Sequence, residues 1–228
     1  SDEEDSDDDG CEGATVFDPI KGVHYNPITV LDFASLYPNS MILQNLSHET
    51  HVEKDGEYDN LPGYKYNNIT YYIPTTEIDP LTGEEIKKEK ICRFAEKLDK
   101  SKGIIPRILM QLLSARKKYK KMMAEENKKG NKFKASILDG LQLAYKVTAN
   151  SLYGQTGAST SQIYKKEIAA STTATGRDML QYAKYFIEDI FGTILKYSIK
   201  GQKNDLKEYM KEIFKDIKEE NINNIKER

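Results

Sequence analysis

The sequence predicts an α+β fold in which antiparallel strands backed by helices are interrupted by a two-helix hairpin. The stretch 69–75 is aromatic and β-branched and is flanked by turn sequences, which indicates antiparallel strands. Two long segments, 103–126 and 131–153, have helical apolar spacing on either side of Gly130. Because Gly130 leaves only a short turn, we expect these helices to pair antiparallel.

Composition restricts the class of protein. Apolar residues make up 38% of the 228 residues and charged residues 31%, which is typical of a globular chain with a heavily charged surface. Cys11 and Cys92 have no zinc-ligand spacing, so we expect neither a disulfide framework nor a structural zinc site, and a reducing compartment is favoured. No apolar run approaches the roughly 20 residues that cross a bilayer, so no membrane partner is expected.

The first elements follow from local pattern. Residues 1–15 are acidic and contain glycines, which indicates a mobile linker or the edge of an insertion, and folding is expected to begin near Val16. The run 28–33 is apolar and β-branched at its start, which favours a buried strand. From 34 to 46 the spacing becomes helical, so the sequence predicts a strand that continues directly into a helix.

The remaining elements are mostly helical. Between 47 and 97 we expect short antiparallel strands joined by turns near 55–56 and 81–83. The hairpin helices come next, with Pro106 in the first turn of the first one. A third helix is predicted over 168–191, and a charged amphipathic helix from 205 to the end.

Charge is segregated along the chain. The net charge is only −2, but 2–9 is almost wholly acidic, whereas 116–134 holds nine lysines and arginines. The predicted tip of the helical hairpin is therefore strongly positive. For Lys117, Lys118 and Lys121 the ordinary interpretation is a solvated helix face.

Two groups of residues are candidates for chemistry. Asp32 ends the predicted strand, where it is either a metal ligand or the N-cap of the helix that follows; cap residues are common at this position. Lys146 and Asn150 lie on one helical stripe, and Arg116 and Lys120 have the same spacing on the partner helix. Paired helices could aim these side chains at one triphosphate, and a solvated basic face is the alternative.

Motifs within these segments resemble those of a known family. The sequence DFASLYP at 32–38 resembles motif A of B-family DNA polymerases, and KVTANSLYG at 146–154 resembles their motif B. Residues 103–117 are similar to the first fingers helix of that family, and 168–177 to the palm segment that follows. The two motifs occur in the family's order and separation, which makes coincidence very unlikely.

The resemblance runs from about residue 11 to 191 and implies a polymerase palm interrupted by a two-helix fingers hairpin. It divides the chain into an acidic linker at 1–15, a first palm part at 16–96, the fingers hairpin at 97–155, and a second palm part at 156–228 with a candidate helical insertion at 192–228.

The resemblance also implies roles for the motif A residues. Asp32 would bind both ions of a two-metal site, which we expect to be Mg²⁺, and the carbonyl of Phe33 would help to hold one of them. The backbone amides of Ser35 and Leu36 would face the triphosphate. Tyr37 would lie beneath the sugar and exclude a 2′-hydroxyl.

Motif B and the first fingers helix complete the implied site, with Lys146 also counted as catalytic because it neutralises charge on the phosphates. The implied nucleotide contacts are Arg116, Lys120, Lys146 and Asn150, and the implied contacts to the nascent base pair and template are Tyr153 and Gly154. Ordinary packing is the alternative for Tyr37 and Tyr153, and a helix cap is the alternative for Asn150.

The resemblance implies that the chain is a fragment of a DNA-templated DNA polymerase, and that the whole protein adds deoxynucleotides to a primer 3′-hydroxyl in DNA replication. The implied partners are primer-template DNA, deoxynucleoside triphosphates and the remaining polymerase domains, namely the exonuclease, the thumb and the rest of the palm. A sliding clamp is a further candidate partner. The location implied is intracellular, in a nucleus or a viral replication compartment, and the Lys- and Asn-rich composition is typical of large DNA viruses or AT-rich protists.

The sequence departs from the family in two places. The first is Cys11-Glu12-Gly13-Ala14, where family members often have Tyr-x-Gly-Gly or Tyr-x-Gly-Ala. The second is decisive. The Tyr-Gly-Asp-Thr-Asp-Ser motif C, which supplies a second metal-binding aspartate, does not occur in these residues. We therefore expect the isolated chain not to extend a primer. The competing hypothesis is a non-catalytic nucleic-acid or nucleotide-binding module on a polymerase-like scaffold. A helical interaction protein is a third hypothesis, but it leaves 32–38 unexplained.

Overall fold

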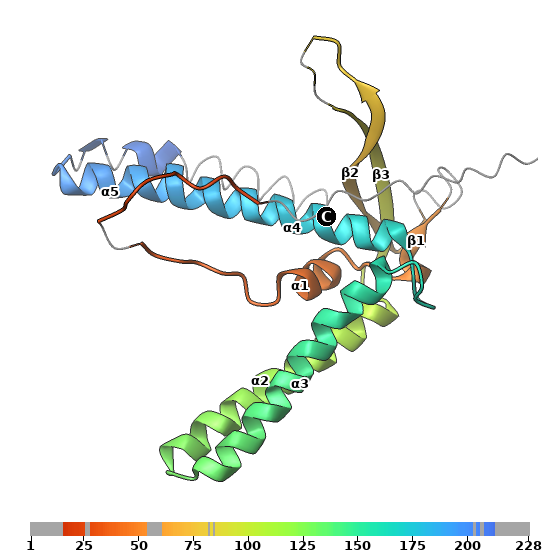
Figure 1. Ribbon diagram of the computed structural model, residues 1–228, viewed down its shortest axis with the longest axis vertical. Helices are drawn as coiled ribbons and strands as arrows, with labels where there is room; N and C mark the ends of the chain where they lie inside the picture. The colour runs from red at the N-terminus through yellow and green to blue at the C-terminus, as the bar shows by residue number, and fades with distance from the viewer. Residues whose placement is uncertain are drawn as a thin grey trace, which may run out of the picture. The chain divides into compact units, whose positions relative to one another are not determined.

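The computed structural model describes residues 16–25, 28–53, 61–81, 83, 85–202, 204–205 and 208–212. The chain divides into two compact units, 1–176 and 177–228. The first unit contains the sheet, helix α1 and the helical hairpin (Figure 1). Helix α4 (Lys166–Tyr185) begins in the first unit and ends in the second.

The described strands form one antiparallel sheet. Its order is β1 (His51–Val52), β3 (Glu85–Lys97), β2 (Tyr64–Ile78). Strands β2 and β3 make a long hairpin that closes near Gly83, where φ is +72°. The antiparallel arrangement confirms the prediction, and Leu81 and Gly83, the described residues of the predicted turn at 81–83, lie between the two strands. Strands β2 and β3 have 15 and 13 residues and are not short. The predicted turn at 55–56 lies outside the described residues.

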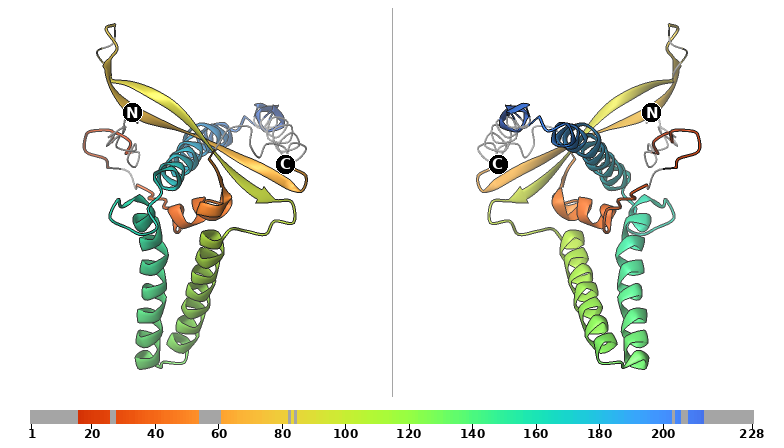
Figure 2. Two further views of the ribbon diagram at one scale, coloured as in Figure 1. Left: turned by 90° about the vertical axis from the view of Figure 1, so that its right-hand side faces the viewer. Right: turned by 90° about the vertical axis from the view of Figure 1, so that its left-hand side faces the viewer.

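Helices α2 (Ile104–Lys128) and α3 (Lys132–Gly157) form the predicted hairpin (Figure 2). Gly130 has a φ of +77°, a left-handed conformation that costs glycine little, so the chain can reverse within a few residues. The side chain of Asn131 then caps α3 by accepting a hydrogen bond from the amide of Lys134 at 3.4 Å.

One apolar core joins the elements of the first unit. Met41 of α1 (Leu36–Leu43) and Leu46 just after it are fully buried, as are Phe94 of β3, Leu109 of α2 and Ile168 of α4. Burial of each side chain of this size stabilises the fold by about 1.5–3 kcal/mol. The core therefore fixes α1 against the sheet and against the base of the helical hairpin.

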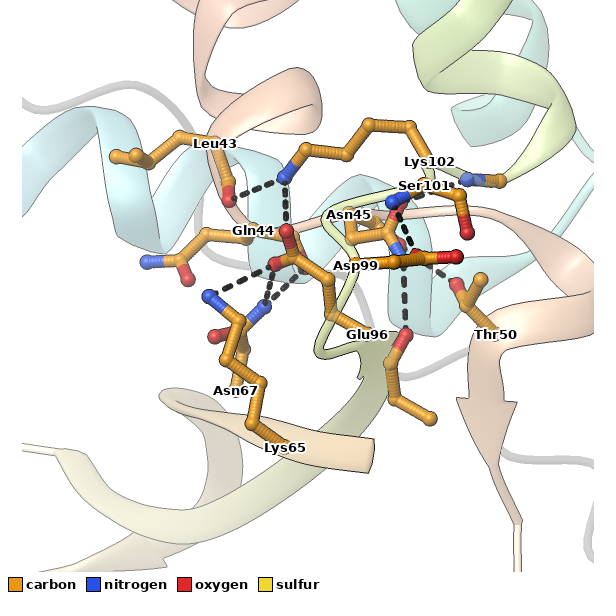
Figure 3. Close-up of polar contacts among 12 residues, drawn as sticks. Leu43, Gln44, Asn45, Thr50, Lys65, Asn67, Glu96, Asp99, Ser101 and Lys102 are labelled. Atoms are coloured by element: carbon orange, nitrogen blue, oxygen red, sulfur yellow. Dashed lines mark hydrogen bonds and ion pairs between the residues drawn. The ribbon is translucent and has the colours of Figure 1, made fainter. Parts of the chain in front are cut away.

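Polar contacts fix the start of α2 to the segment that follows α1 (Figure 3). Asn45 donates from Nδ2 to the carbonyl of Ala95 at 2.8 Å and accepts from the amide of Gly103 at 2.8 Å. Glu49 and Ser47, in the 3₁₀ turn η1 (His48–Thr50) and just before it, accept from the next two amides of α2, at 2.5 and 3.2 Å. These side chains satisfy helix amides that have no partner within the helix.

The predicted buried strand at 28–33 is wrong for this structure. The segment has no strand, and Ile28, Val30 and Leu31 are 67–85% exposed. A β-branched run becomes a strand only where another strand pairs with it, and no described segment does so. The helix predicted over 34–46 is confirmed in its central part as α1.

The second unit is helical where it is described. Helix α4 continues into a six-residue π-helix, η2 (Phe186–Phe191), and then into α5 (Gly192–Ile199). This confirms the helix predicted over 168–191. The helix predicted from 205 onward lies mostly outside the described residues, although 204–205 and 208–212 are helical. No described helix is long and apolar enough to cross a membrane.

Candidate active site

A pocket of about 570 Å³ lies between the segment 32–38 and the two hairpin helices. Helix α1 packs against both α2 and α3, which brings these parts of the chain together. Nine of the eleven site residues named from the sequence line the pocket: Asp32, Phe33, Ser35, Leu36, Tyr37, Arg116, Lys120, Lys146 and Asn150. Ala34 and Pro38 complete the lining, and Tyr153 and Gly154 do not contribute to it.

The backbone at Ser35 forms one wall of the pocket. Its φ and ψ are 56° and 54°, a left-handed conformation that costs a non-glycine residue on the order of 1 kcal/mol or more. Asn39 compensates by donating from Nδ2 to the carbonyls of Ala34 and Ser35 at 2.8 and 3.1 Å. The turn at Ser35 places the amino end of α1, with its unpaired amides, beside the pocket.

The helical hairpin supplies the positive charge. Arg116 donates from Nη1 to Ser35 Oγ at 3.4 Å and from Nε to Gln142 Oε1 at 3.3 Å, so it links α2 to both the turn and α3. Lys120 lies one turn further along α2, and Lys146 faces the pocket from α3. Three cations thus line a pocket that contains one carboxylate, Asp32, and this charge balance favours a polyanionic ligand.

Gln142 was missed from the sequence. It orients Arg116 and is in turn fixed by its own hydrogen bond to Asp139, at 2.9 Å. Its position four residues before Lys146 was a usable signal, because the helical stripe that groups Lys146 with Asn150 extends back to it.

Tyr37 is held from two sides. Its ring packs against that of Tyr153, with centroids 4.4 Å apart and planes tilted by 42°. The Tyr153 hydroxyl is within 3.1 Å of Thr173 Oγ1. A Cβ at Gly176 would lie 3.0 Å from Tyr37 Cε1, so only glycine leaves full room for the ring. Burial and, to a smaller extent, Tyr153 raise the pKa of the Tyr37 hydroxyl.

The last two sequence-predicted residues lie near the carboxyl end of α3. Tyr153 reaches the pocket only through its contact with Tyr37. A Cβ at Gly154 would meet no atom within 4 Å, so this position on α3 is open. Neither residue is part of the pocket lining.

The pocket has part of what a magnesium site needs. The Asp32 carboxylate and the Phe33 carbonyl are hard oxygen ligands of the kind that Mg²⁺ prefers. Within the described residues, no group of three or more His, Cys, Asp or Glu side chains could hold a metal ion. The donor type fits the ion, but one carboxylate is too few for two ions.

A second pocket, of about 670 Å³, lies between β1, β3 and the start of α4. Its lining has three cations and three carboxylates, and several of them pair with each other. Lys165 contacts Glu53, and Lys90 lies 3.8 Å from Glu167. Because these charges largely compensate one another, the smaller pocket, with its excess of cations, is the better candidate site.

Comparison of the sequence with known proteins identifies similar DNA polymerases. The model of DNA polymerase family B matches residues 1–220. The DNA polymerase of Pyramimonas orientalis virus is 44% identical over 231 residues, covering 83% of this chain and 19% of that protein. The DNA polymerase delta catalytic subunit of Oryza sativa subsp. japonica is 39% identical over 190 residues, covering 83% of this chain and 15% of that protein.

A solved family B DNA polymerase from the archaeon Pyrobaculum calidifontis aligns with a TM-score of 0.45 and 26% identity, covering 74% of this chain and 17% of that one. The chain therefore spans less than a fifth of the length of these proteins. The family model, which matches nearly the whole chain, and the two curated relatives agree. This chain belongs to DNA polymerase family B.

Proposed function

We propose that this chain forms the nucleotide-binding half of the active site of a polymerase that adds deoxynucleotides to a primer 3′-hydroxyl during DNA replication. The observation that carries the proposal is the pocket in which nine of the sequence-predicted site residues, from three separate segments, meet. In this proposal the sheet, α1 and α4 belong to a palm, and α2 with α3 forms the fingers. The substrates are primer-template DNA and deoxynucleoside triphosphates.

The triphosphate would bind to the cations of the hairpin. Arg116, Lys120 and Lys146 converge from two helices, and each charge-assisted hydrogen bond to a phosphate oxygen contributes roughly 1.5–3 kcal/mol. The amino end of α1 offers the amides of Ser35 and Leu36 to the same anion. Lys146 would also neutralise the charge that develops on the phosphates as the bond to the leaving group breaks.

The sugar would rest against Tyr37. The ring packs against Tyr153 and lies close to Gly176, and these contacts favour a fixed ring that leaves no space for an extra hydroxyl. Deoxynucleotides would be selected because a 2′-hydroxyl has no room, and not because of an attractive contact.

Asp32 and the carbonyl of Phe33 would hold their share of two Mg²⁺ ions. When bound, such ions activate the attacking hydroxyl and stabilise the leaving pyrophosphate. Because the pocket offers one carboxylate, we expect the purified chain to bind nucleotide without extending a primer. Primer extension by the purified chain would contradict this expectation.

The first test is magnesium-dependent binding of a deoxynucleoside triphosphate to the purified chain and to Lys146→Ala. Removal of one charge-assisted hydrogen bond should weaken binding roughly 10- to 100-fold. Lys118→Ala is the matched control, because it removes the same charge from an exposed position of the hairpin that does not line the pocket. If both variants weaken nucleotide binding equally, the nucleotide binds through the overall charge of the hairpin, and the pocket is not its binding site.

A non-catalytic nucleotide- or nucleic-acid-binding module is the second candidate. The single carboxylate of the pocket favours it. The sequence of the longer protein discriminates between the two. A downstream aspartate pair in a motif C hairpin supports the enzyme, and substitution of both aspartates supports the binding module.

A further inference from the structure

The tip of the helical hairpin, defined as residues 126–134, displays an aromatic ring to solvent. Phe133 lies in the first turn of α3 and is 79% exposed. An exposed phenylalanine forgoes the stabilisation that burial of its ring would give the fold. Such a position is poor for folding and suited to contact with a partner.

The surroundings of this ring are strongly positive. Lys132 and Lys134 flank Phe133 in the sequence, Lys128 and Lys129 end the preceding helix, and all four are exposed. Among the described residues, Lys128 and Lys132 form no ion pair. A ring within a cluster of cations indicates a partner that offers flat apolar faces and negative charge together.

The tip is preorganised. Glu126 is only 9% exposed and accepts hydrogen bonds from Lys129 at 3.3 Å, Lys134 at 3.2 Å and Asn131 at 3.2 Å. The amide of Asn131 also bonds to the carbonyl of Glu126 at 3.0 Å. With Gly130 already in its left-handed conformation, the turn is held so that Phe133 stays exposed, and little order would be lost on binding.

We propose that the hairpin tip is a binding surface for single-stranded nucleic acid, with Phe133 stacking on a base and Lys128 and Lys132 contacting phosphates. Unpaired bases expose the faces that an aromatic ring needs, whereas the bases of a duplex are already stacked. Lys128 lies eight residues beyond Lys120, about 12 Å along α2 at 1.5 Å per residue. The surface is thus separate from the nucleotide pocket and does not rest on its proposed role.

The test is fluorescence anisotropy of a labelled oligothymidylate with the purified chain, over a range of salt concentrations. Phe133→Ala should weaken binding about 5- to 100-fold, and Phe133→Leu should weaken it to a similar extent, because stacking needs the ring. Lys128→Gln with Lys132→Gln should lower the slope of log affinity against log salt by roughly 0.7 for each phosphate that the variant no longer neutralises. Lys88→Gln with Lys97→Gln, two exposed lysines of β3, is the matched control and should leave the slope unchanged.

Three outcomes would overturn the proposal. If both Phe133 variants bind with the affinity of the wild type, the ring does not contribute and the tip binds nucleic acid only by non-specific charge attraction. An equal loss in Phe133→Ala for duplex of the same length would remove the preference for single strands. If polyglutamate displaces the oligonucleotide equally well from the wild type and from Phe133→Ala, the partner of the tip would instead be an acidic protein. Far-UV circular dichroism and nucleotide binding, both expected to be unchanged in Phe133→Ala, separate this surface from folding and from the pocket.

Discussion

Glu96 provides the sharpest test of how the first unit is held together (Figure 3). Its carboxylate is 3% exposed and contacts Lys102 Nζ at 2.8 Å, Lys65 Nζ at 3.2 Å and Asn67 Nδ2 at 3.3 Å. Lys102 and Asn67 also donate to the carbonyls that end α1, at 3.4 and 3.0 Å. Glu96→Ala therefore removes the one acceptor that these three donors share.

The expected loss of stability in Glu96→Ala follows from how deeply its ion pairs are buried. Removing one partner of a fully buried ion pair costs about 3–5 kcal/mol. Lys102 and Lys65 are 17% and 29% exposed, so water can partly replace the missing carboxylate. We expect the free energy of unfolding to fall by about 2–3 kcal/mol, which for a chain of this size lowers the melting temperature by roughly 4–12 °C.

The effect should depend on pH. Burial alone would raise the pKa of Glu96, but its contacts with Lys102, Asn67 and Lys65 outweigh burial and hold the pKa below its usual value. A carboxyl whose pKa is lower in the folded than in the unfolded state stabilises the fold above the unfolded pKa. That stability is lost as the pH falls through the folded pKa. The difference between the wild type and Glu96→Ala should therefore shrink on acidification.

Urea unfolding followed by far-UV circular dichroism, at neutral pH and at a series of acidic values, measures this difference. Glu89→Ala is the control, because Glu89 is an exposed carboxylate of the same strand, and its loss should change stability by less than about 0.5 kcal/mol. If Glu96→Ala is as mild as the control, or if its effect grows as the pH falls, the buried ion pairs do not stabilise the fold in this way.

Two glycine substitutions test the packing around the site. Gly103→Ala places a Cβ 2.9 Å from both Glu49 Oε1 and Thr50 Cγ2, so it should lower the free energy of unfolding by about 1–3 kcal/mol in the same urea assay. An unchanged free energy would show that the side chains around the start of α2 can move apart to accommodate the methyl group. Gly176→Ala places a Cβ 3.0 Å from Tyr37 Cε1, and we expect roughly tenfold weaker deoxynucleotide binding with little loss of stability, because alanine gains about 1 kcal/mol of helix propensity. Unchanged nucleotide binding would show that the Tyr37 ring does not set the shape of the pocket.

Local pattern was sufficient for the helical part of the fold. The apolar spacing of α2 and α3 and the break at Gly130 fixed the hairpin, because helical periodicity and a left-handed turn are properties of neighbouring residues. The same spacing grouped Lys146 with Asn150 on one face, and both line the pocket. The motif resemblance added the other residues of 32–38 and gave a role to Asp32, which local pattern alone left between a metal ligand and a helix cap.

The parts that local pattern missed depend on contacts distant in sequence. The length of β2 was hidden by Asn67, Asn68 and Pro74, which usually favour turns. Asn67 is tolerated in the strand because its amide donates to Glu96 and to the carbonyl of Gln44. Gly176 gives no signal of its own, because its importance comes from the Tyr37 ring on another element.

The exposed run before Asp32 and the single carboxylate of the pocket have a common explanation. Val30 and Leu31 are 85% and 67% exposed although their sequence is that of a buried strand. Asp32, at the end of the same run, is the only carboxylate among the described residues that line the pocket. A strand pairs only where a neighbouring strand supplies backbone partners, and a metal site needs several hard oxygen ligands, so one added strand that pairs with 28–33 and carries a carboxylate would meet both requirements.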